Sequence, residues 1–190
     1  MIAPAESQEN DASETTPAKV PDFLVLARYG RVPQVARFAG FGTVIARDQS
    51  VVVSTERGDE LAICLQCLPA PKASDSAPAL TGECLRIATP DDLNRNHQLT
   101  ERGEGSFPIW LKRVVDWKLQ LELIDLEFTL DERLILYVLN ERNAETTRFA
   151  LLSAAAGLGI VHVQPVSTEG IVPSGGGGGC GSCSTSGGCH

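Results

Sequence analysis

One segment in the second half of the chain limits the possible folds more than any other. It reads LQLELIDLEFTLDERLILYVLNE, residues 119–141, and places leucines at alternate positions up to Leu123 before the alternation resumes at Leu126. A second apolar run, residues 134–139, follows the polar residues 131–133. Alternate side chains share one face of a strand, and a short polar connection between two such runs is typical of a hairpin. We therefore predict two antiparallel strands over this segment.

The segments that follow predict a helix packed on the same sheet. Residues 143–157 have apolar side chains at helical spacing and end in Gly157, a residue suited to helix termination. The expected buried face consists of Phe149, Leu152 and Ala156. Residues 160–166 then return to a strand pattern. The order strand, strand, helix, strand predicts an α+β layer, in which a helix lies on a sheet.

The middle of the chain carries a helix start after a short strand predicted over residues 84–88. Thr89 is a good N-cap residue, and Pro90 suits the first helical position. Asp91 and Asp92 place negative charge at the positive end of the helix dipole. These four residues together predict the start of a helix.

We expect this helix to end near Gly103, because glycine is a poor helix former. A second helix is predicted over residues 108–117. Its buried face is expected to include Ile109, Leu111, Val114 and Val115.

Short apolar runs separated by turns dominate residues 22–69. Residues 51–53 and 61–68 flank the sequence Glu-Arg-Gly-Asp at positions 56–59. Because Gly58 supplies the positive φ that a tight turn requires, the flanking runs predict a second hairpin. Aromatic residues make up only 5% of the chain, so the core must consist mainly of aliphatic side chains. Strands at this spacing predict a small antiparallel sheet or a partly closed barrel.

Changes in composition divide the chain into five segments. Residues 1–21 are predicted to be a disordered acidic leader, because they combine low hydrophobicity with net negative charge. Residues 70–82 form a Pro/Ser/Ala-rich loop, and residues 167–190 form a flexible Gly/Cys-rich tail. A small antiparallel β subdomain, 22–69, and an α+β domain, 83–166, lie between these segments. The predicted fold class is α+β, with an antiparallel β-rich N-terminal part followed by helices and a β-hairpin–helix–strand layer.

Charge and hydropathy argue against two kinds of partner. The chain has a formal net charge of −8, whereas binding to nucleic acid normally needs a positive surface. We therefore expect direct nucleic-acid binding to be weak or absent. No run of about 18 apolar residues is present, so no membrane span is expected. The leader lacks the apolar centre of an export signal, so we expect a cytoplasmic protein whose cysteines stay reduced.

The sequence offers no set of residues typical of an enzyme. It has three histidines, no Gly-x-Ser-x-Gly motif, and no lysine after a Gly-x4-Gly phosphate loop. Asp125 and Glu127 lie two apart on a predicted strand and so share a face, as an acid–base pair of carboxylates would. We favour a solvated strand face beside Glu122, because no His or Lys motif accompanies the pair. We therefore predict that the protein is not an enzyme.

Three cysteines lie within the predicted strands. Cys64 and Cys67 have the spacing of a zinc knuckle, but residues three apart on a strand point to opposite faces. Both thiols can therefore reach one metal only if the strand bends between them. A free cysteine also packs well as a small apolar side chain. We favour core packing for this pair and for Cys84.

The other three cysteines form a different pattern at the end of the chain. The order Cys180-x2-Cys183-x5-Cys189-His190 follows a run of five glycines. Three thiols and an imidazole can form a Cys3His zinc site, and three thiolates can hold part of an iron–sulfur cluster. Metal binding would have to offset the entropy lost when the glycines are ordered. Two alternatives follow, a metal site on these four residues or a solvated tail open to oxidation.

Three stretches of the sequence resemble one known family. They are SVVVSTERGDEL at residues 50–61, CLRIATPDDL at residues 84–93, and residues 118–137, which contain ELIDLEF. Together they resemble the PSP-one C-terminal domain family, which includes the bacterial RicT/YaaT-like regulatory proteins. The resemblance covers residues 23–166, and its three motifs occur in the same order as in the family.

The resemblance implies a non-catalytic cytoplasmic regulatory protein that acts through protein–protein interaction. Family members assemble with two small helical regulatory subunits, carry iron–sulfur clusters on cysteines, and influence RNA maturation by a membrane-tethered endoribonuclease. This chain has Cys180-Gly181-Ser182-Cys183 where the family has Cys-Gly-Arg-x-x-Cys-Cys. The first hypothesis is thus a scaffold for protein partners. The alternative is a metal-binding or redox-sensing protein that works through its tail, and direct RNA binding is the weakest of the three.

Overall fold

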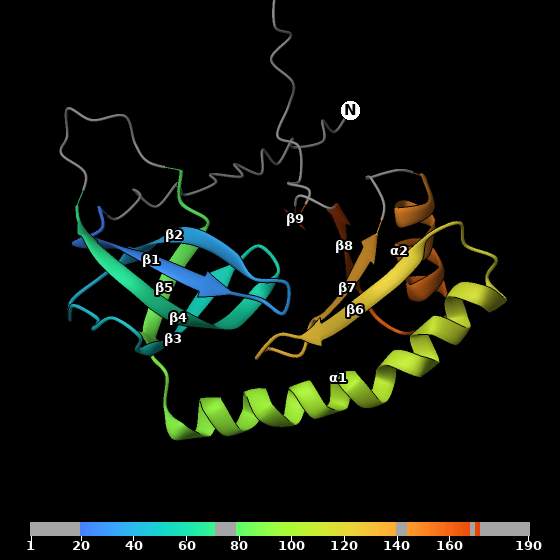
Figure 1. Cartoon of the computed structure of the whole chain (residues 1–190), viewed down its shortest axis with the longest axis horizontal. Coiled ribbons are helices and arrows are strands. Elements are labelled where there is room, and N and C mark those ends of the chain that lie inside the picture. Colours follow the sequence, from blue (N-terminus) through green and yellow to red (C-terminus); the bar gives the residue numbers. More distant parts are fainter. Residues whose placement is uncertain (1–19, 71–78, 140–143, 168–169, 172–190) are drawn as a thin grey trace, which may run out of the picture.

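A computed structural model of the chain describes residues 20–70, 79–139, 144–167 and 170–171. The predicted leader lies outside these ranges except for its last two residues, and so do the greater part of the 70–82 loop and most of the tail. The described residues form a mixed α and β fold with a five-stranded barrel, a four-stranded sheet and two helices. Figure 1 shows the sheet between the barrel and the shorter helix, while the longer helix runs along the underside of both.

The N-terminal part is a closed barrel. Its strands are β1 (Phe23–Tyr29), β2 (Gln34–Gly40), β3 (Ser50–Thr55), β4 (Gly58–Pro69) and β5 (Gly82–Ile87), in the order β1-β2-β5-β3-β4. The β3–β4 hairpin confirms the pairing predicted around the Glu-Arg-Gly-Asp turn. Strand pairing is antiparallel except for a short parallel contact between β2 and β5.

Closure of the barrel depends on β5, which the sequence places in the following domain. β5 pairs with β2 on one side and β3 on the other, so the barrel is fully rather than partly closed. A Cβ at Gly82 would overlap the carbonyl oxygen of Ser54, so the two backbones approach this closely only because residue 82 is glycine. The structural boundary between the two parts therefore falls after β5.

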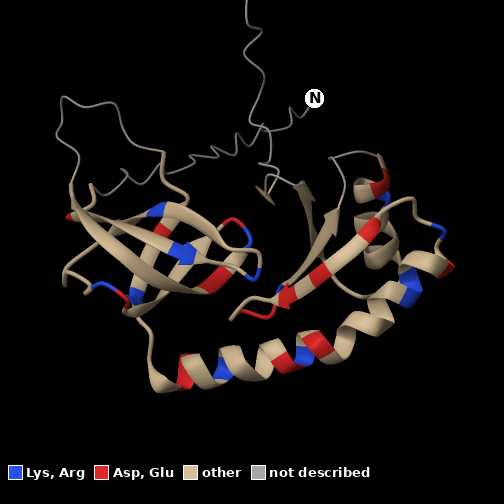
Figure 2. Cartoon of the chain, in the orientation of Figure 1, with Lys and Arg blue, Asp and Glu red and all other residues tan. Residues whose placement is uncertain are grey.

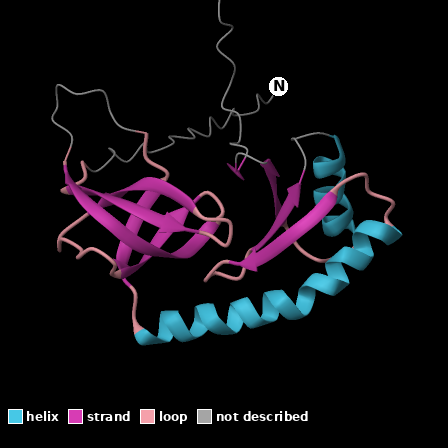
Figure 3. Ribbon diagram, in the orientation of Figure 1, coloured by secondary structure: helices cyan, strands magenta, loops and turns pink. Residues whose placement is uncertain are grey.

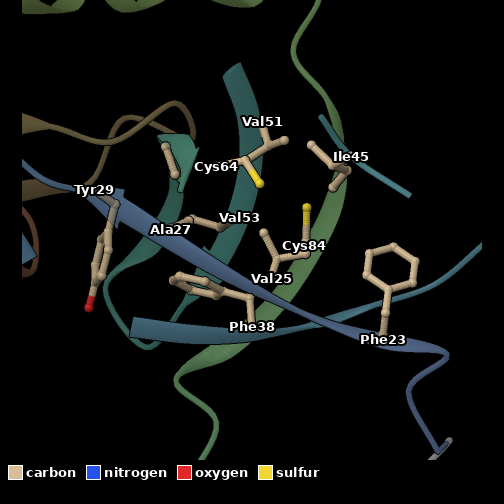
Figure 4. Packing of buried hydrophobic residues seen from close by; sticks show 11 residues of the cluster. Phe23, Val25, Ala27, Tyr29, Phe38, Ile45, Val51, Val53, Cys64 and Cys84 are labelled. Carbon is tan, nitrogen blue, oxygen red and sulfur yellow. The ribbon is translucent and has the colours of Figure 1, made fainter. Parts of the chain in front are cut away.

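The barrel interior is aliphatic, as the composition requires. Its buried residues include Val25, Phe38, Val51 and Val53, none of them exposed to solvent. Figure 4 shows these side chains converging inside the barrel together with Cys64 and Cys84. Tyr29 closes one end by an edge-to-face contact with Phe38, with ring centroids 5.4 Å apart.

The predicted helix start is confirmed in α1 (Pro90–Asp116). The Thr89 hydroxyl accepts a hydrogen bond from the backbone N–H of Asp92, and the Asp92 carboxylate accepts one from the backbone N–H of Thr89. This reciprocal pair is a capping box, which satisfies two N–H groups at the helix end. Arg86 of β5 also binds the Asp92 carboxylate, so the cap ties the helix to the barrel.

The predicted break near Gly103 is wrong, because α1 is one helix of 27 residues. Gly103 is buried, and a Cβ there would lie 3.3 Å from the side chain of Leu126, so the glycine permits a close approach to the sheet. Pro108 also lies inside the helix. Packing outweighs the propensity loss of about 1 kcal/mol for glycine and about 3 kcal/mol for proline. Figure 3 shows α1 as one uninterrupted, curved helix.

The buried face of α1 also differs from the predicted one. Val114 is buried as predicted and Trp110 is buried as well, whereas Ile109 is 54% exposed and Val115 is 74% exposed. Leu111, predicted on the buried face, is exposed as well. Among the described residues no helix combines the length and apolar character needed to cross a membrane.

The C-terminal layer follows the predicted order of elements. It comprises β6 (Glu122–Phe128), β7 (Leu134–Leu139), α2 (Ala144–Ala155), β8 (Val161–Ser167) and β9 (Gly170–Ile171), with the sheet order β6-β7-β8-β9. β6 and β7 form the predicted hairpin, and a bulge at Ile124 explains why the leucine alternation is interrupted there. β7 and β8 are parallel and are connected through α2. β9 extends the sheet into the segment predicted as tail.

Both helices pack on one face of this sheet. Phe149 of α2 is fully buried and contacts Trp110 and Trp117 edge-to-face, with ring centroids 5.8 and 6.1 Å apart. Leu152 is partly buried as predicted, but Ala156 is exposed. Gly157 has a φ of +73°, which confirms its predicted role at the helix end. The opposite face of the sheet turns towards the barrel.

Candidate functional site

The barrel and the C-terminal layer are joined by a buried arginine. Arg57, in the β3–β4 turn, is 4% exposed, and its guanidinium donates two hydrogen bonds to the carboxylate of Glu60. Its third hydrogen bond, of 2.9 Å, runs to the hydroxyl of Tyr137 on β7. The carboxylate of Glu127 on β6 lies 3.7 Å from the same guanidinium. One cation from the barrel thus contacts groups from both parts of the molecule.

The β3–β4 turn positions Arg57 for this contact. Thr55 and Gly58 are paired, which leaves two residues in the turn. The Thr55 hydroxyl donates a 2.7 Å hydrogen bond to Glu60, so both Thr55 and Arg57 hold this carboxylate in place. The turn also docks against the β6–β7 turn, where the backbone N–H of Leu130 donates a 2.7 Å hydrogen bond to the carbonyl of Asp59.

The electrostatics of this cluster keep the arginine charged and the tyrosine neutral. Burial acts to lower the pKa of Arg57, but Glu60, Tyr137 and Glu127 raise it above its ordinary value. Burial and the neighbouring Glu127 raise the pKa of Tyr137. The Tyr137 hydroxyl accepts a hydrogen bond from Arg57 and donates one to Glu127, so it bridges the cation and the carboxylate. The cluster is a fixed structural link between the two parts.

Asp125 and Glu127 have a structural role that neither sequence interpretation anticipated. Arg31, in the β1–β2 turn, donates from Nε to Asp125 at 3.0 Å and from its backbone N–H to Glu127 at 2.6 Å. Its guanidinium also reaches Glu104 of α1 at 3.3 Å. The Glu127 side chain is only 17% exposed, so the solvated-face interpretation is wrong for this residue. Figure 2 shows acidic positions recurring along β6, and two of these carboxylates hold the β1–β2 turn.

A cleft of about 250 Å³ lies beside this junction. Its walls come from β1 and β4 of the barrel, from the first half of α1, and from the end of β6 with the turn that follows. Apolar contacts are supplied by Leu61, Ile63 and Phe128, and polar groups by Arg28, Asn96 and Thr100. The cleft is therefore a mixed polar and apolar site between the barrel and the elements that follow it.

The internal cysteines lie in the barrel core. Cys64 and Cys84 are buried and Cys67 is half-buried, which confirms the predicted packing role. The expectation that Cys64 and Cys67 face opposite ways is wrong, because a bulge at Leu65 shifts the register and turns both towards the interior. The Cys67 thiol donates to the carbonyl of Ile45 at 3.2 Å. Among the described residues no group of three His, Cys, Asp or Glu side chains is arranged to hold a metal ion.

We predict that these buried thiols react slowly in the native protein. Burial raises the pKa of both Cys64 and Cys84 to about 11, from an ordinary value of 9.0. In a chain carrying Cys180→Ser, Cys183→Ser and Cys189→Ser, at most the half-buried third thiol should react promptly with a disulfide reagent at pH 8. All three should react at once in denaturant. Equal rates in the native and unfolded states would contradict the burial.

The raised pKa values of Cys64 and Cys84 also predict that the free energy of unfolding depends on pH in the alkaline range. A thiol whose pKa is raised by folding stabilises the native state below its unfolded pKa, and this contribution disappears as the pH rises towards the folded value. The free energy of unfolding should therefore fall between pH 9 and 11, the range between the ordinary and shifted pKa values of Cys64 and Cys84. Denaturant titrations of the same tail variant test this. Valine at positions 64 and 84 should reduce the slope over that range.

The four predicted metal ligands, Cys180, Cys183, Cys189 and His190, lie outside the described residues. The other two histidines are engaged locally, because His97 lies 3.4 Å from Glu101 and the His162 ring lies 3.4 Å from Gln164.

The residues of the junction were missed at the sequence level. An arginine in a hairpin turn is normally solvated, so no pattern distinguishes Arg57 from an exposed turn residue. Tyr137 lies in an apolar run, and the sequence does not indicate which residue its hydroxyl bonds to. The one usable signal was the spacing of Asp125 and Glu127 on a predicted strand. It indicates two carboxylates on one face, but it does not predict which cations bind them.

No protein-family model, curated protein or solved structure matches the chain. The resemblance to the PSP-one family therefore stays a prediction from three motifs. The first and third motifs contribute to the junction, and the second contributes to the cap that ties α1 to the barrel. The first contains the β3–β4 turn with Arg57, the second contains Arg86 and Asp92 at the start of α1, and the third contains Glu127 and Tyr137.

Proposed function

We propose that the chain is a non-catalytic regulatory or scaffold protein of the PSP-one type, which acts in the cytoplasm by binding protein partners in a complex that influences RNA maturation. The observation that carries this proposal is the junction itself. Its ionisable side chains are bonded to one another across the two parts, and these bonds support a structural role for Asp125 and Glu127. Two parts linked in this way form a frame that can present surfaces to partners.

The outer face of α1 is our candidate surface for a helical partner. Pro108, Leu111 and Val115 are exposed and follow one another at intervals of three and four residues, so they form a stripe along the helix. Leu111 is 40% exposed and Val115 is 74% exposed. Exposed apolar stripes of this kind favour packing against another helix. The small helical subunits implied by the family resemblance are partners of that chemistry.

Two further observations support the details of the proposal. The three described cysteines are free thiols, which is typical of a reducing compartment such as the cytoplasm. The net charge of −8 favours protein partners over direct contact with RNA.

The proposal predicts that negative charge on α1 abolishes partner binding. Leu111→Glu combined with Val115→Glu should lower recovery of partner proteins at least fivefold in pull-downs from the native cells. Val35→Glu, at a 57% exposed position on the barrel, is the matched control and should leave recovery unchanged. Recovered partners should be small helical proteins that re-form a complex with the purified chain. No specific partner, or equal recovery with both variants, would contradict the proposal.

A metal-binding or redox-sensing tail is the second candidate function. The observation that favours it is that Cys64 and Cys84 are enclosed in the barrel, which leaves the tail cysteines as a separate set with the Cys-x2-Cys spacing of a metal site. Protein purified without oxygen should then contain iron with a broad visible absorption band, or stoichiometric zinc. A chain ending at Ser174 should contain neither, whereas Cys64→Ser should keep the metal. Metal-free full-length protein would exclude this candidate.

A further inference from the structure

The junction cleft has a charged group without an internal partner. Arg31, Glu60 and Glu127 also line it, but Arg31 is bonded to Asp125, and the two glutamates are bonded to the junction cluster. Within the described part of the chain, Arg28 makes no hydrogen bond or ion pair through its side chain. Arg28 therefore lines the cleft, and its exposed guanidinium has no partner among the described residues that would compete with an anion.

The opposite wall supplies a second unpaired group. Asn96 of α1 is half-buried, and its amide forms no side-chain hydrogen bond with any residue that the structure describes. Thr100, one turn further along α1, donates its hydroxyl hydrogen to the backbone carbonyl of Asn96 at 2.9 Å, which leaves the hydroxyl oxygen as an acceptor. Polar residues of the barrel and of α1 thus line the same cleft.

The remaining walls are apolar. Leu61 and Ile63 of β4 are half-buried on the barrel side, and Phe128 closes the cleft from the sheet. The guanidinium of Arg102 lies over the Phe128 ring, 4.3 Å from its centroid, so the ring is held in position. The cleft volume is about 250 Å³. That space suits a compact organic molecule rather than an extended chain.

We propose that this cleft binds a small organic anion, a carboxylate with a compact apolar or aromatic body. Arg28 binds the carboxylate, since guanidinium and carboxylate match in charge and in geometry. Asn96 donates to the same carboxylate from α1, and the apolar body lies against Leu61, Ile63 and Phe128. The ligand would therefore connect the barrel with the helix that presents the proposed partner surface.

Nuclear magnetic resonance titration of the full-length ¹⁵N-labelled protein with benzoate tests the proposal. Benzoate should shift the side-chain amide of Asn96 and the backbone amides of Leu61, Thr100 and Phe128 in a saturable manner. Benzamide, which has the same shape without the charge, should bind at least about tenfold more weakly, as expected for loss of one charged hydrogen-bonded contact.

Arg28→Gln and Arg37→Gln form a matched pair of variants. Both arginines are exposed on the outer face of neighbouring strands, but only Arg28 lines the cleft. Arg28→Gln should weaken benzoate binding about tenfold, and Arg37→Gln should leave it unchanged. The proposal is overturned if benzoate produces no shifts around the cleft, if benzamide binds equally well, or if both variants weaken binding to the same extent.

Discussion

Replacing Arg57 with methionine is expected to lower the free energy of unfolding by about 3–5 kcal/mol. The variant leaves the carboxylate of Glu60 buried without its cation, and it removes the donor that reaches Tyr137 across the junction. Breaking one side of a buried pair costs more than removing both sides, because the remaining charge is uncompensated. Denaturant unfolding followed by circular dichroism measures this change.

A double variant separates the buried charge from a simple loss of contacts. Arg57→Met with Glu60→Leu removes both members of the pair and should recover most of the lost stability. Arg47→Met is the control, since Arg47 is 76% exposed and its pairing with Asp48 is also exposed. A single variant at position 57 as stable as the control would show that the junction does not hold the two parts together.

Phe149→Ala is expected to lower the free energy of unfolding by about 3–5 kcal/mol as well. The ring is fully buried and contacts Trp110 and Trp117, so its removal opens a cavity where α2 meets α1 and the sheet. Both tryptophans should report the change through an altered fluorescence spectrum of the native state. Differential scanning calorimetry and denaturant unfolding measure the loss of stability.

Leu151→Ala is the matched control for this variant. Leu151 lies on the same helix and is 66% exposed, so its truncation should change stability by less than about 0.5 kcal/mol. Similar losses at positions 149 and 151 would mean that α2 does not pack on the sheet through the ring of Phe149.

The structure connects the two proposals for this protein through one element. α1 is capped at the barrel by Thr89 and Asp92, lines the cleft with Asn96 and Thr100, and exposes its apolar stripe further along. A ligand held between the barrel and Asn96 would therefore contact the same helix that we propose for partner binding. Measuring partner recovery with and without benzoate would show whether the two sites are coupled.

Features that depend on neighbouring residues were determined by the sequence itself. The two hairpins, the N-cap at Thr89 and the helix end at Gly157 were all predicted and are all present. Each arises from side-chain periodicity, a capping hydrogen bond or a positive φ, and these act over a few residues. The interrupted leucine alternation before Leu126 is also a local feature, because it coincides with a β-bulge between Leu123 and Asp125.

Features that depend on distant residues were decided only by the tertiary structure. α1 continues through Gly103 because the glycine fits against Leu126, and the barrel closes because Gly82 allows β5 to approach β3. Arg57 becomes a buried link because it meets Tyr137, 80 positions along the chain. Local propensity differs by only about 1–3 kcal/mol per residue, whereas burial and pairing across the chain contribute as much or more at each site. Tertiary packing therefore determined the continuity of α1, the closure of the barrel and the burial of Arg57, which the local sequence pattern did not.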